Sequence, residues 1–276
     1  MTTTLRDVLQ VVENLWPEAG AEEWDEPGLV VGGLDHEVTK ICLVVDVTSK
    51  SVTEALEGGA DLIIAHHPLL LRGVTTVAES TAKGSLVSAL IRSGCALYSA
   101  HTNADVVPTG TSARLAELLG IGKTEPIVSS HTPGHGIGRV GDLASPMSLY
   151  ELASRLSAVI PHTAVGPVVA GDASRHVSRV AVCAGVGDSL LSEPAVLSSD
   201  VFITSDLRHH PASEFLELSE ISEGPALISI SHFAAEWVWL DTAAEELRKA
   251  LSVDVVVSDV STDPWTFQIQ QVGERS

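Results

Sequence analysis

Asp61-Leu-Ile-Ile-Ala-His66-His67-Pro68 is a short apolar run that ends in two histidines and a proline, and it indicates how the chain is organised. A related run, Asp200-Val-Phe-Ile-Thr, leads after four extra residues into His209-His210-Pro211. Each run follows an earlier apolar stretch that opens with a basic residue, Lys40 or Arg179, 21 positions before the aspartate. Short apolar runs of this kind are typical of buried strands.

The match between the two halves continues downstream. Ala96-Leu-Tyr-Ser-Ala ends in His101 with Asp105 four residues later, and Ala226-Leu-Ile-Ser-Ile-Ser ends in His232 with Glu236 four residues later. Each half therefore reads as strand, helix, strand, His-His-Pro, helix, strand and His-x-x-x-acid. This period is too long for a solenoid. The sequence predicts a duplicated unit whose halves face each other across a pseudo-twofold axis.

Apolar strands and helical stretches alternate along the chain, which favours an α/β or layered α+β fold. The predicted strands are apolar on both faces, as in sheets covered by helices, and they are Ile41–Val45, Leu62–Ala65, Ala96–Ala100, Val180–Ala184, Val201–Thr204, Ala226–Ile230 and Val253–Val257. The predicted helices are Ser49–Glu57, Lys83–Arg92, Thr111–Leu119, Ser148–Ala158, Pro211–Glu220 and Ala234–Leu251. We expect two similar lobes, each with a mixed sheet covered by helices.

The stretch from Gly120 to Gly141 is rich in proline, glycine and serine, and its first half lacks a long periodic pattern. Such a composition marks a boundary between lobes. We expect an N-terminal lobe over residues 1–122 and a C-terminal lobe over 123–276. The last segment, from about residue 226, is expected to pack back on the first lobe.

The chain has 276 residues, a mean hydropathy of +0.25 and a formal net charge of −20, from 16 basic and 36 acidic residues. A chain of this length and composition is globular. Its charge repels a phosphate backbone at long range, so we expect no general nucleic-acid binding and no docking on anionic lipid. Bound metal ions would still allow a small anionic ligand.

The expected compartment is the cytoplasm. The sequence contains no apolar run of membrane-spanning length, and its first residues form an amphipathic pattern instead of a signal sequence. The three cysteines, Cys42, Cys95 and Cys183, lie far apart in apolar strand-like runs. This spacing indicates buried thiols, with neither a disulfide framework nor a cysteine zinc site.

Histidines gather directly after the predicted strands of both halves, at His66, His67, His101, His209, His210 and His232. Divalent transition metals bind imidazole nitrogen and carboxylate oxygen, and strand ends hold such ligands rigidly. His232 and Glu236 share one face if a helix starts there. Pro68 favours a turn at His67, so that both neighbouring histidines can face one cleft. The pattern predicts a site for two metals about 3.5–4 Å apart, which favours attack by hydroxide.

Two other motifs leave alternatives open. His209 and His210 are candidate catalytic residues that complete the metal shell, act as general acid or base, or bind substrate. Gly185-Val-Gly187-Asp188-Ser189 follows a predicted strand, so its amides either receive a phosphate or form a tight turn.

Five motifs taken together resemble those of the GTP cyclohydrolase I type 2 family, also called the Ngg-interacting-factor-three-like dinuclear metal proteins. In chain order they are Trp24-Asp25-Glu26-Pro27-Gly28-Leu29-Val30-Val31-Gly32, Asp61 to Pro68, His101-Thr-Asn-Ala-Asp105, Thr204-Ser-Asp206-Leu-Arg-His209-His210 and Ser231-His232-Phe-Ala-Ala-Glu236. The resemblance covers Leu5 to about Leu251. It is to the short form, which lacks the central domain that longer members insert between the halves.

The resemblance implies two divalent ions per chain, with Glu236 or Asp105 as the bridge, held by His66, His67, Asp105, His232 and Glu236. It places His101 close by, as an additional ligand or a neighbour of the ligands, and Asp25 is a candidate for a supporting role. It also implies a toroidal homohexamer whose metal sites face an inner cavity. Nitrogen and oxygen ligands without sulfur permit zinc, iron, manganese, cobalt or nickel.

The function expected from these observations is that of a metal-dependent hydrolase with a dinuclear site between two α/β lobes. The family name implies opening of the guanine ring of GTP, but the sequence shows no evident code for base recognition, so the expected substrate is a nucleotide or another small phosphorylated compound. The alternative is a non-catalytic protein that binds or delivers metal, or a regulatory assembly partner. An open coordination position beside a polar pocket distinguishes the enzyme from a closed storage or structural site.

Overall fold

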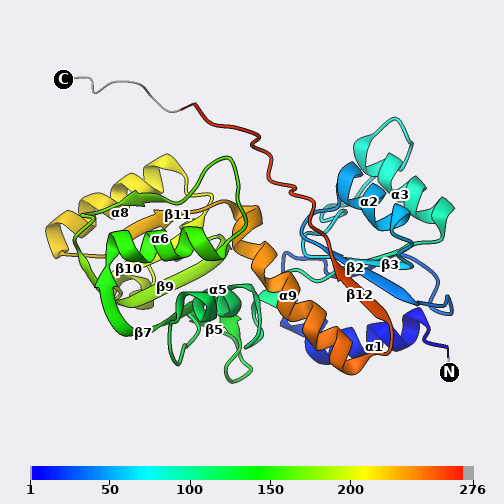
Figure 1. Cartoon of the computed structure of the whole chain (residues 1–276), viewed down its shortest axis with the longest axis horizontal. Coiled ribbons are helices and arrows are strands. Elements are labelled where there is room, and N and C mark those ends of the chain that lie inside the picture. The colour runs from blue at the N-terminus through cyan, green and yellow to red at the C-terminus, as the bar shows by residue number, and fades with distance from the viewer. Residues whose placement is uncertain (1, 270–276) are drawn as a thin grey trace.

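The computed structural model describes residues 2–269 and shows two α/β lobes side by side along the long axis of the molecule (Figure 1). Each lobe is built on a five-stranded sheet, and a long helix, α9 (His232–Ala250), runs between them. The predicted fold class, two similar lobes with mixed sheets covered by helices, is therefore confirmed.

The first sheet has the strand order β1-β4-β3-β2-β12, with β1 (Gly28–Val31), β2 (Lys40–Val44), β3 (Leu62–Ala65), β4 (Ala96–Ser99) and β12 (Asp254–Val257). All neighbouring strands run parallel except β1, which is antiparallel to β4. Alternate side chains enter two apolar cores, Ile41 and Leu62 on one face and Cys42 and Ile63 on the other. This two-sided burial explains why the strands are apolar throughout.

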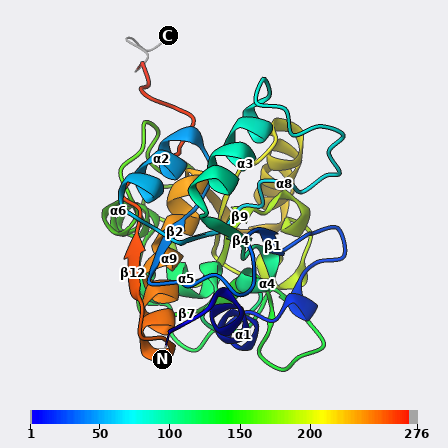
Figure 2. The same ribbon diagram turned by 90° about the vertical axis from the view of Figure 1, so that its right-hand side faces the viewer.

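Helices cover both faces of the first sheet. They are α1 (Leu5–Leu15), α2 (Ser49–Glu57) and α3 (Ala82–Ser93), and the short helix α4 (Thr102–Asp105) follows β4, while a 3-10 turn, η1 (Glu18–Gly20), follows α1. Figure 2 shows α1 and α9 below this sheet and α2 and α3 above it. Thr4, Thr48 and Thr81 cap α1, α2 and α3, because each hydroxyl accepts a hydrogen bond from the backbone N–H three residues later.

The second sheet has the order β7-β9-β10-β11-β8, with β7 (Arg139–Ser148), β8 (Val168–Ala170), β9 (His176–Val186), β10 (Val201–Ser205) and β11 (Ala226–Ser229). Its three central strands are parallel, and the edge strands β7 and β8 are antiparallel to their neighbours. A small hairpin of β5 (Val128–Ser129) and β6 (Gly136–Ile137) lies between the two lobes in sequence.

The helices of the second lobe again form two layers. They are α5 (Thr111–Leu119), α6 (Leu149–Val159), α7 (Pro194–Leu197) and α8 (His209–Ser222), and the 3-10 turn η2 (Asp188–Leu190) precedes α7. Leu115 of α5 and Leu152 of α6 belong to one core of this sheet, whereas Val196 of α7 and Phe215 of α8 belong to the other.

The duplication is visible in hydrogen bonds. Asp61 Oδ2 accepts from Thr39 N and Lys40 N, and Asp200 Oδ2 accepts from the equivalent Ser178 N and Arg179 N. The equivalence continues at the strand ends, where Ala100 N donates to Ala65 O and Ile230 N donates to Thr204 O. Ser205, the last residue of β10, and Asp206 are therefore the structural counterparts of His66 and His67. The gap of four residues assumed in the sequence comparison is misplaced, and His209 and His210 are not the structural counterparts of His66 and His67.

The end of the chain returns to the first lobe. Residues 226–229 still belong to the second sheet, so the return begins with α9. Trp239 and Leu247 of α9 enter the first lobe's core, whereas Ala235 and Val238 enter the second lobe's core. After α9, β12 pairs in parallel with β2. One helix thus contributes to both hydrophobic cores.

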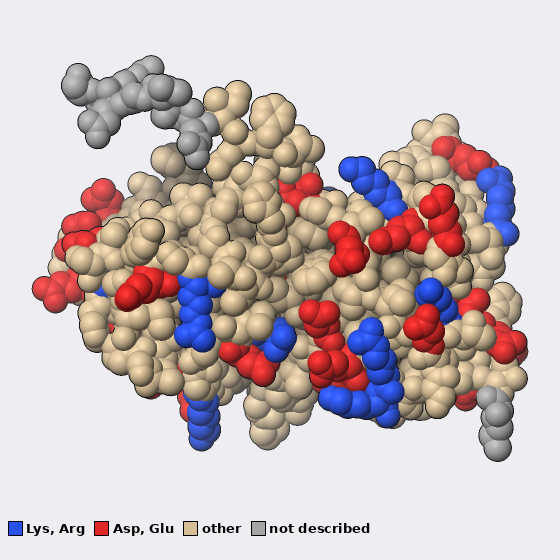
Figure 3. All heavy atoms as spheres, viewed as in Figure 1, with Lys and Arg blue, Asp and Glu red and all other residues tan. Residues whose placement is uncertain are grey.

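Burial and surface agree with the composition. Cys42, Cys95 and Cys183 are buried free thiols, as the sequence predicts. Figure 3 shows acidic side chains spread over the visible face with basic side chains interspersed among them. No helix within residues 2–269 combines the length and apolar character that crossing a membrane requires.

Candidate metal centre

Histidines and carboxylates from both lobes meet where β3 and β4 end and α9 begins. Parallel strands bring their carboxyl ends to one edge of a sheet, so His66 and His67 after β3 lie beside His101 after β4. Asp105 is the last residue of α4, and α9 supplies His232 and Glu236 from its first two turns. Folding therefore gathers side chains from the two halves of the sequence.

Glu236 lies at the centre of this cluster and is only 3% exposed. Its Oε2 is 2.9 Å from His67 Nε2, and its Oε1 is 2.9 Å from His232 Nε2. His66 Nε2 lies 3.5 Å from Glu236 Oε1 and 3.7 Å from Asp105 Oδ1. The two oxygens of Glu236 thus face different histidines, as a bridging carboxylate requires.

The other ring nitrogen of each histidine is fixed by an oxygen acceptor. His66 Nδ1 bonds to the Ala100 carbonyl at 2.9 Å, and His101 Nδ1 bonds to Asp25 Oδ1 at 2.7 Å. His67 Nδ1 bonds to Asp46 Oδ1 at 2.8 Å, and His232 Nδ1 bonds to Asp206 Oδ2 at 2.6 Å. An oxygen that can only accept selects the tautomer with the proton on Nδ1, which leaves Nε2 available as a ligand.

The donor set fits a divalent cation. Among the described residues, the buried His66 Nε2 has no hydrogen-bond partner, and an unpaired buried polar atom costs about 1–3 kcal/mol. Two groups of side chains each have ligand atoms within 4.8 Å of one another, His66 with His67 and His101, and His67 with His232 and Glu236. His67 belongs to both groups. Imidazole nitrogen with carboxylate oxygen is the ligand chemistry of transition-metal ions.

The electrostatics of the cluster favour positive charge at its centre. Burial lowers the pKa of a histidine, yet the Glu236 carboxylate outweighs it, holding the pKa of His67 well above its ordinary value and raising that of His232 to about 10. Burial likewise raises the pKa of Glu236, but the three facing histidines hold it well below its ordinary value. Metal ligation needs neutral imidazole, so a bound cation replaces these protons.

No role was predicted for Asp46 or Asp206, the carboxylates that orient His67 and His232, although Asp206 lies in one of the family motifs. Asp206 lies six residues after Asp200, just as His67 lies six residues after Asp61. Counting without a gap would have aligned Asp206 with His67, which is the one available signal. The sequence contains no comparable signal for Asp46, because many strands are followed by an aspartate that has no role in a site. Burial raises the pKa of Asp46, but the hydrogen bond and charge of His67, together with the hydrogen bond from Thr262, outweigh burial and lower the pKa. The hydrogen bond with His232 lowers the pKa of Asp206.

Asp25, which the sequence placed in a supporting role, holds His101 and the start of α4. Its carboxylate accepts from His101 Nδ1 and from the backbone and hydroxyl of Thr102. Burial raises its pKa, but these hydrogen bonds outweigh burial and lower the pKa to about 2. The neighbouring Trp24 contacts the His101 ring edge-on at 5.7 Å between ring centres.

His209 and His210 lie apart from the cluster. They form the exposed first turn of α8, with their rings 5.1 Å apart, edge to face. Neither lines the two cavities beside the cluster. Gly187 precedes the 3-10 turn η2, and Gly185 belongs to β9, so that motif forms a strand end and a tight turn.

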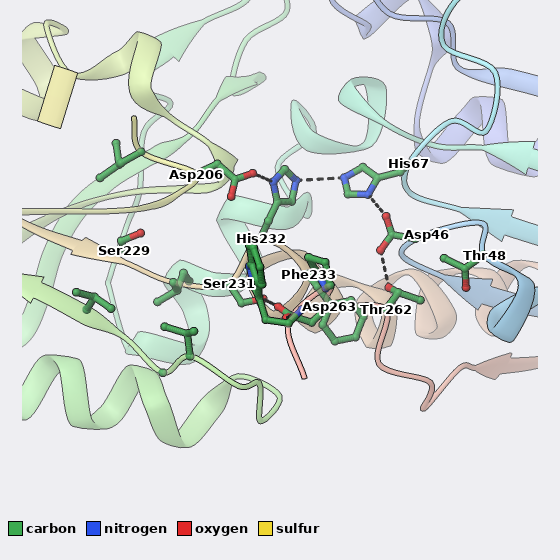
Figure 4. Close-up of a pocket in the computed structure, with 17 residues that line it drawn as sticks. Asp46, Thr48, His67, Asp206, Ser229, Ser231, His232, Phe233, Thr262 and Asp263 are labelled. Atoms are coloured by element: carbon green, nitrogen blue, oxygen red, sulfur yellow. Dashed lines mark hydrogen bonds and ion pairs between the residues drawn. The ribbon is translucent and has the colours of Figure 1, made fainter. Parts of the chain in front are cut away.

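Two cavities open beside the cluster. The first, of about 540 Å³, is lined by His67, His232, Asp46, Asp206 and residues 262–265. Figure 4 shows the His67 and His232 rings facing each other here, with Asp46 and Asp206 behind them. The second, of about 300 Å³, is lined by Trp24, His101, Asp105, Glu236 and the 183–186 segment, among others. Solvent and small molecules therefore have access to the donor atoms from two sides.

Comparison with known proteins agrees with this architecture. The chain is 42% identical over 273 residues to the GTP cyclohydrolase 1 type 2 homolog of Streptomyces coelicolor, covering 96% of this chain and 94% of that relative. It is 32% identical to the protein of the same name from Mycobacterium leprae, covering 100% of this chain and 98% of the relative. That alignment runs over 385 positions, so the relative contains additional residues between the matched parts, consistent with a short form here.

The fold matches a solved structure as well. The Bacillus cereus protein related to NIF3 superimposes with a TM-score of 0.86 at 22% identity, covering 97% of this chain and 100% of that one. The sequence matches a family profile over residues 3–264. The chain therefore belongs to the Duf34/NIF3 (NGG1p interacting factor 3) family.

Proposed function

We propose that this protein is a metal-dependent hydrolase whose dinuclear site lies between the two lobes. The observation that carries the proposal is the pair of overlapping donor groups that share His67 and surround the buried Glu236. The proposed ligands are His66, His67, Asp105, His232 and Glu236, with His101 as an additional ligand or neighbour. Two divalent ions would supply Lewis acidity and a nucleophilic water at neutral pH.

In this proposal the chain's own residues bind the ions and orient the imidazole ligands. Glu236 presents one oxygen to each side of the cluster, and Asp46, Asp206 and Asp25 hold three imidazole rings so that Nε2 points inward. Because the ligands come from both lobes, the relative position of the lobes sets the distance between the ion positions. The exposed His209 and His210 have no part in this arrangement.

The proposed substrate is a nucleotide or another small phosphorylated compound. Two divalent ions would outweigh the charge of the ligands Asp105 and Glu236 and would present positive charge to a small anion, while Asp25, Asp46 and Asp206 lie on the far side of the imidazole rings. The name of the curated relatives, GTP cyclohydrolase 1 type 2 homolog, supports a nucleotide. The net charge of −20 favours a small ligand over a nucleic-acid polymer.

We further propose a cytoplasmic homohexamer, on the strength of the family resemblance. Light scattering coupled to size exclusion should give six times the chain mass of 28.9 kDa. A monomer or dimer at micromolar concentration would contradict this part of the proposal and leave the metal site unaffected, because the donor set lies within one chain.

The alternative is a protein that binds or delivers metal without turnover. It predicts the same ligands but a closed site. The two cavities that reach the cluster favour the hydrolase, since they leave room for a substrate beside the donors.

Glu236→Gln tests the proposal, with Glu245→Gln as the matched control on the exposed face of the same helix. We expect two ions per wild-type chain by elemental analysis, and hydrolysis of a nucleotide or phosphoester that a chelator abolishes. Glu236→Gln should weaken metal binding by about 100-fold and abolish turnover, because the shared carboxylate is lost. Unchanged turnover in Glu236→Gln would refute the enzyme. Stoichiometric metal without turnover across the substrate panel would favour the alternative.

A further inference from the structure

The segment that follows β12, residues 258–265, crosses the first cavity, and we call it the C-terminal strap. Figure 1 shows it leaving the first lobe and passing over the gap toward the second. Thr262, Asp263, Pro264 and Trp265 form one wall of the cavity of about 540 Å³ that contains His67 and His232. The strap therefore lies within reach of the metal centre, although the family motifs in the sequence do not include it.

The strap is anchored by side-chain hydrogen bonds at three places. Ser258 is tied to the first lobe, since its N–H donates to Leu43 O and its carbonyl accepts from Trp237 Nε1 at 3.0 Å. Asp263 accepts a hydrogen bond from the hydroxyl of Ser231, the residue that caps α9 directly before His232. Between these two points, the Thr262 hydroxyl donates to Asp46 Oδ2.

Thr262 hydrogen-bonds to the carboxylate of Asp46, which also orients His67. Asp46 uses Oδ1 to hold His67 Nδ1 at 2.8 Å, and its second oxygen, Oδ2, accepts the Thr262 hydroxyl. Figure 4 shows these two bonds in line from Thr262 through Asp46 to the His67 ring. A carboxylate held at both oxygens cannot turn about its side-chain axis, so the ring it supports keeps its orientation. His67 is also the one histidine present in both donor groups.

We infer that Thr262 is a positioning residue of the metal centre, which fixes Asp46 and through it the imidazole shared by the two ion positions. This inference rests on the proposed metal site and extends it to a segment outside the ligand motifs. Through this contact, the strap contributes to the metal affinity of a site whose other residues, such as Asp46 and His67, lie far earlier in the sequence.

The test is a titration of the metal-free protein with Co²⁺, followed by its visible absorption and by calorimetry. Thr262→Val keeps the shape of the side chain and removes the hydroxyl, whereas Thr262→Ser keeps the hydroxyl. Thr266→Val makes the same change at an exposed position directly after the strap and serves as the control. Loss of an outer hydrogen bond to a ligand costs about 10–100-fold in metal affinity. We expect about tenfold weaker binding for Thr262→Val, and values within about twofold of wild type for Thr262→Ser and Thr266→Val.

A double-mutant cycle with Asp46→Ala separates positioning from general stability. If Thr262 acts through Asp46, Thr262→Val has no further effect on Co²⁺ affinity once Asp46 is removed. Wild-type affinity in Thr262→Val, equal loss in Thr262→Ser, or additive losses in the double variant would each overturn the inference. In those cases the wild-type protein still binds two ions, whereas a wild-type protein that binds none refutes the proposed metal site itself.

Discussion

At Gly185 the backbone passes close to two side chains of the candidate metal centre, Glu236 and His232. It has φ of +82°, a conformation that side chains other than glycine rarely adopt, and a Cβ placed there would lie 2.5 Å from Glu236 Oε1 and 3.5 Å from His232 Nε2. Both the backbone conformation and the space at this position therefore require glycine.

Gly185→Ala should displace Glu236 and lower metal binding by at least about tenfold, because the added methyl group occupies the space of the carboxylate. Gly59→Ala is the control: Gly59 has φ of +73°, but a Cβ there meets nothing within 4 Å. Both variants should lose about 1–2 kcal/mol of stability from the left-handed backbone. Only Gly185→Ala should lose metal, as measured by elemental analysis of the reconstituted protein. Equal metal content in the two variants would contradict the geometry of the cluster.

The sequence allowed prediction of a cluster of histidines and carboxylates but, apart from Asp25, not of its supports. His66 and His232 were detectable because each follows a predicted strand and shares a short motif with a second candidate ligand, His67 or Glu236. Asp46 and Gly185 each occur once, in contexts that ordinary strand ends share. Their roles depend on contacts between different elements of the fold, which spacing along the chain does not encode.

At the scale of elements, the parallel strands could be predicted, including β12 at the edge of the first sheet, whereas the antiparallel edge strands β1 and β8 could not. The predicted Leu62–Ala65 coincides with β3, and the predicted helix Thr111–Leu119 coincides with α5. β1 and β8 were not predicted, because antiparallel edge strands are partly exposed and lack a continuous apolar run. Val168 in β8, for example, is 57% exposed.

Asp61 links β2 and β3 and should contribute stability that depends on pH. Partial burial raises its pKa, but hydrogen bonds from Thr39 and Lys40 outweigh burial and lower the pKa below the ordinary 3.8. A depressed folded-state pKa stabilises the protein above pH 3.8, and the contribution is lost as pH falls through the folded-state value. Asp61→Asn should therefore cost about 1 kcal/mol at pH 7, and the difference from wild type should shrink below pH 3.8.

Urea unfolding at several pH values measures this difference. Asp35→Asn, at an exposed aspartate that pairs with Arg6, is the control and should change the free energy of unfolding by less than about 0.5 kcal/mol. A cost of Asp61→Asn that stays constant from pH 7 to acid would show that the charge of the carboxylate is irrelevant.

At the scale of the whole molecule, two of the apolar cores bury the three thiols. Burial raises the pKa of Cys42 to about 11 and those of Cys95 and Cys183 to about 12. Because the thiolate is the reactive form, Ellman's reagent at pH 8 should label less than one thiol per native chain and all 3 after unfolding in denaturant. Rapid labelling of a native thiol would show that one of these cores opens readily.

The position of α9 in the sequence also determines when the set of proposed ligands is complete during synthesis. A chain leaves the ribosome with its N-terminus first, so His66 and His67 emerge long before His232 and Glu236, which complete the donor set. The first sheet likewise lacks β12 until residues 254–257 have been synthesised. At the proposed metal site, ion capture would therefore follow the synthesis of α9, because a product that ends before α9 carries an unfinished lobe and an incomplete set of the proposed ligands.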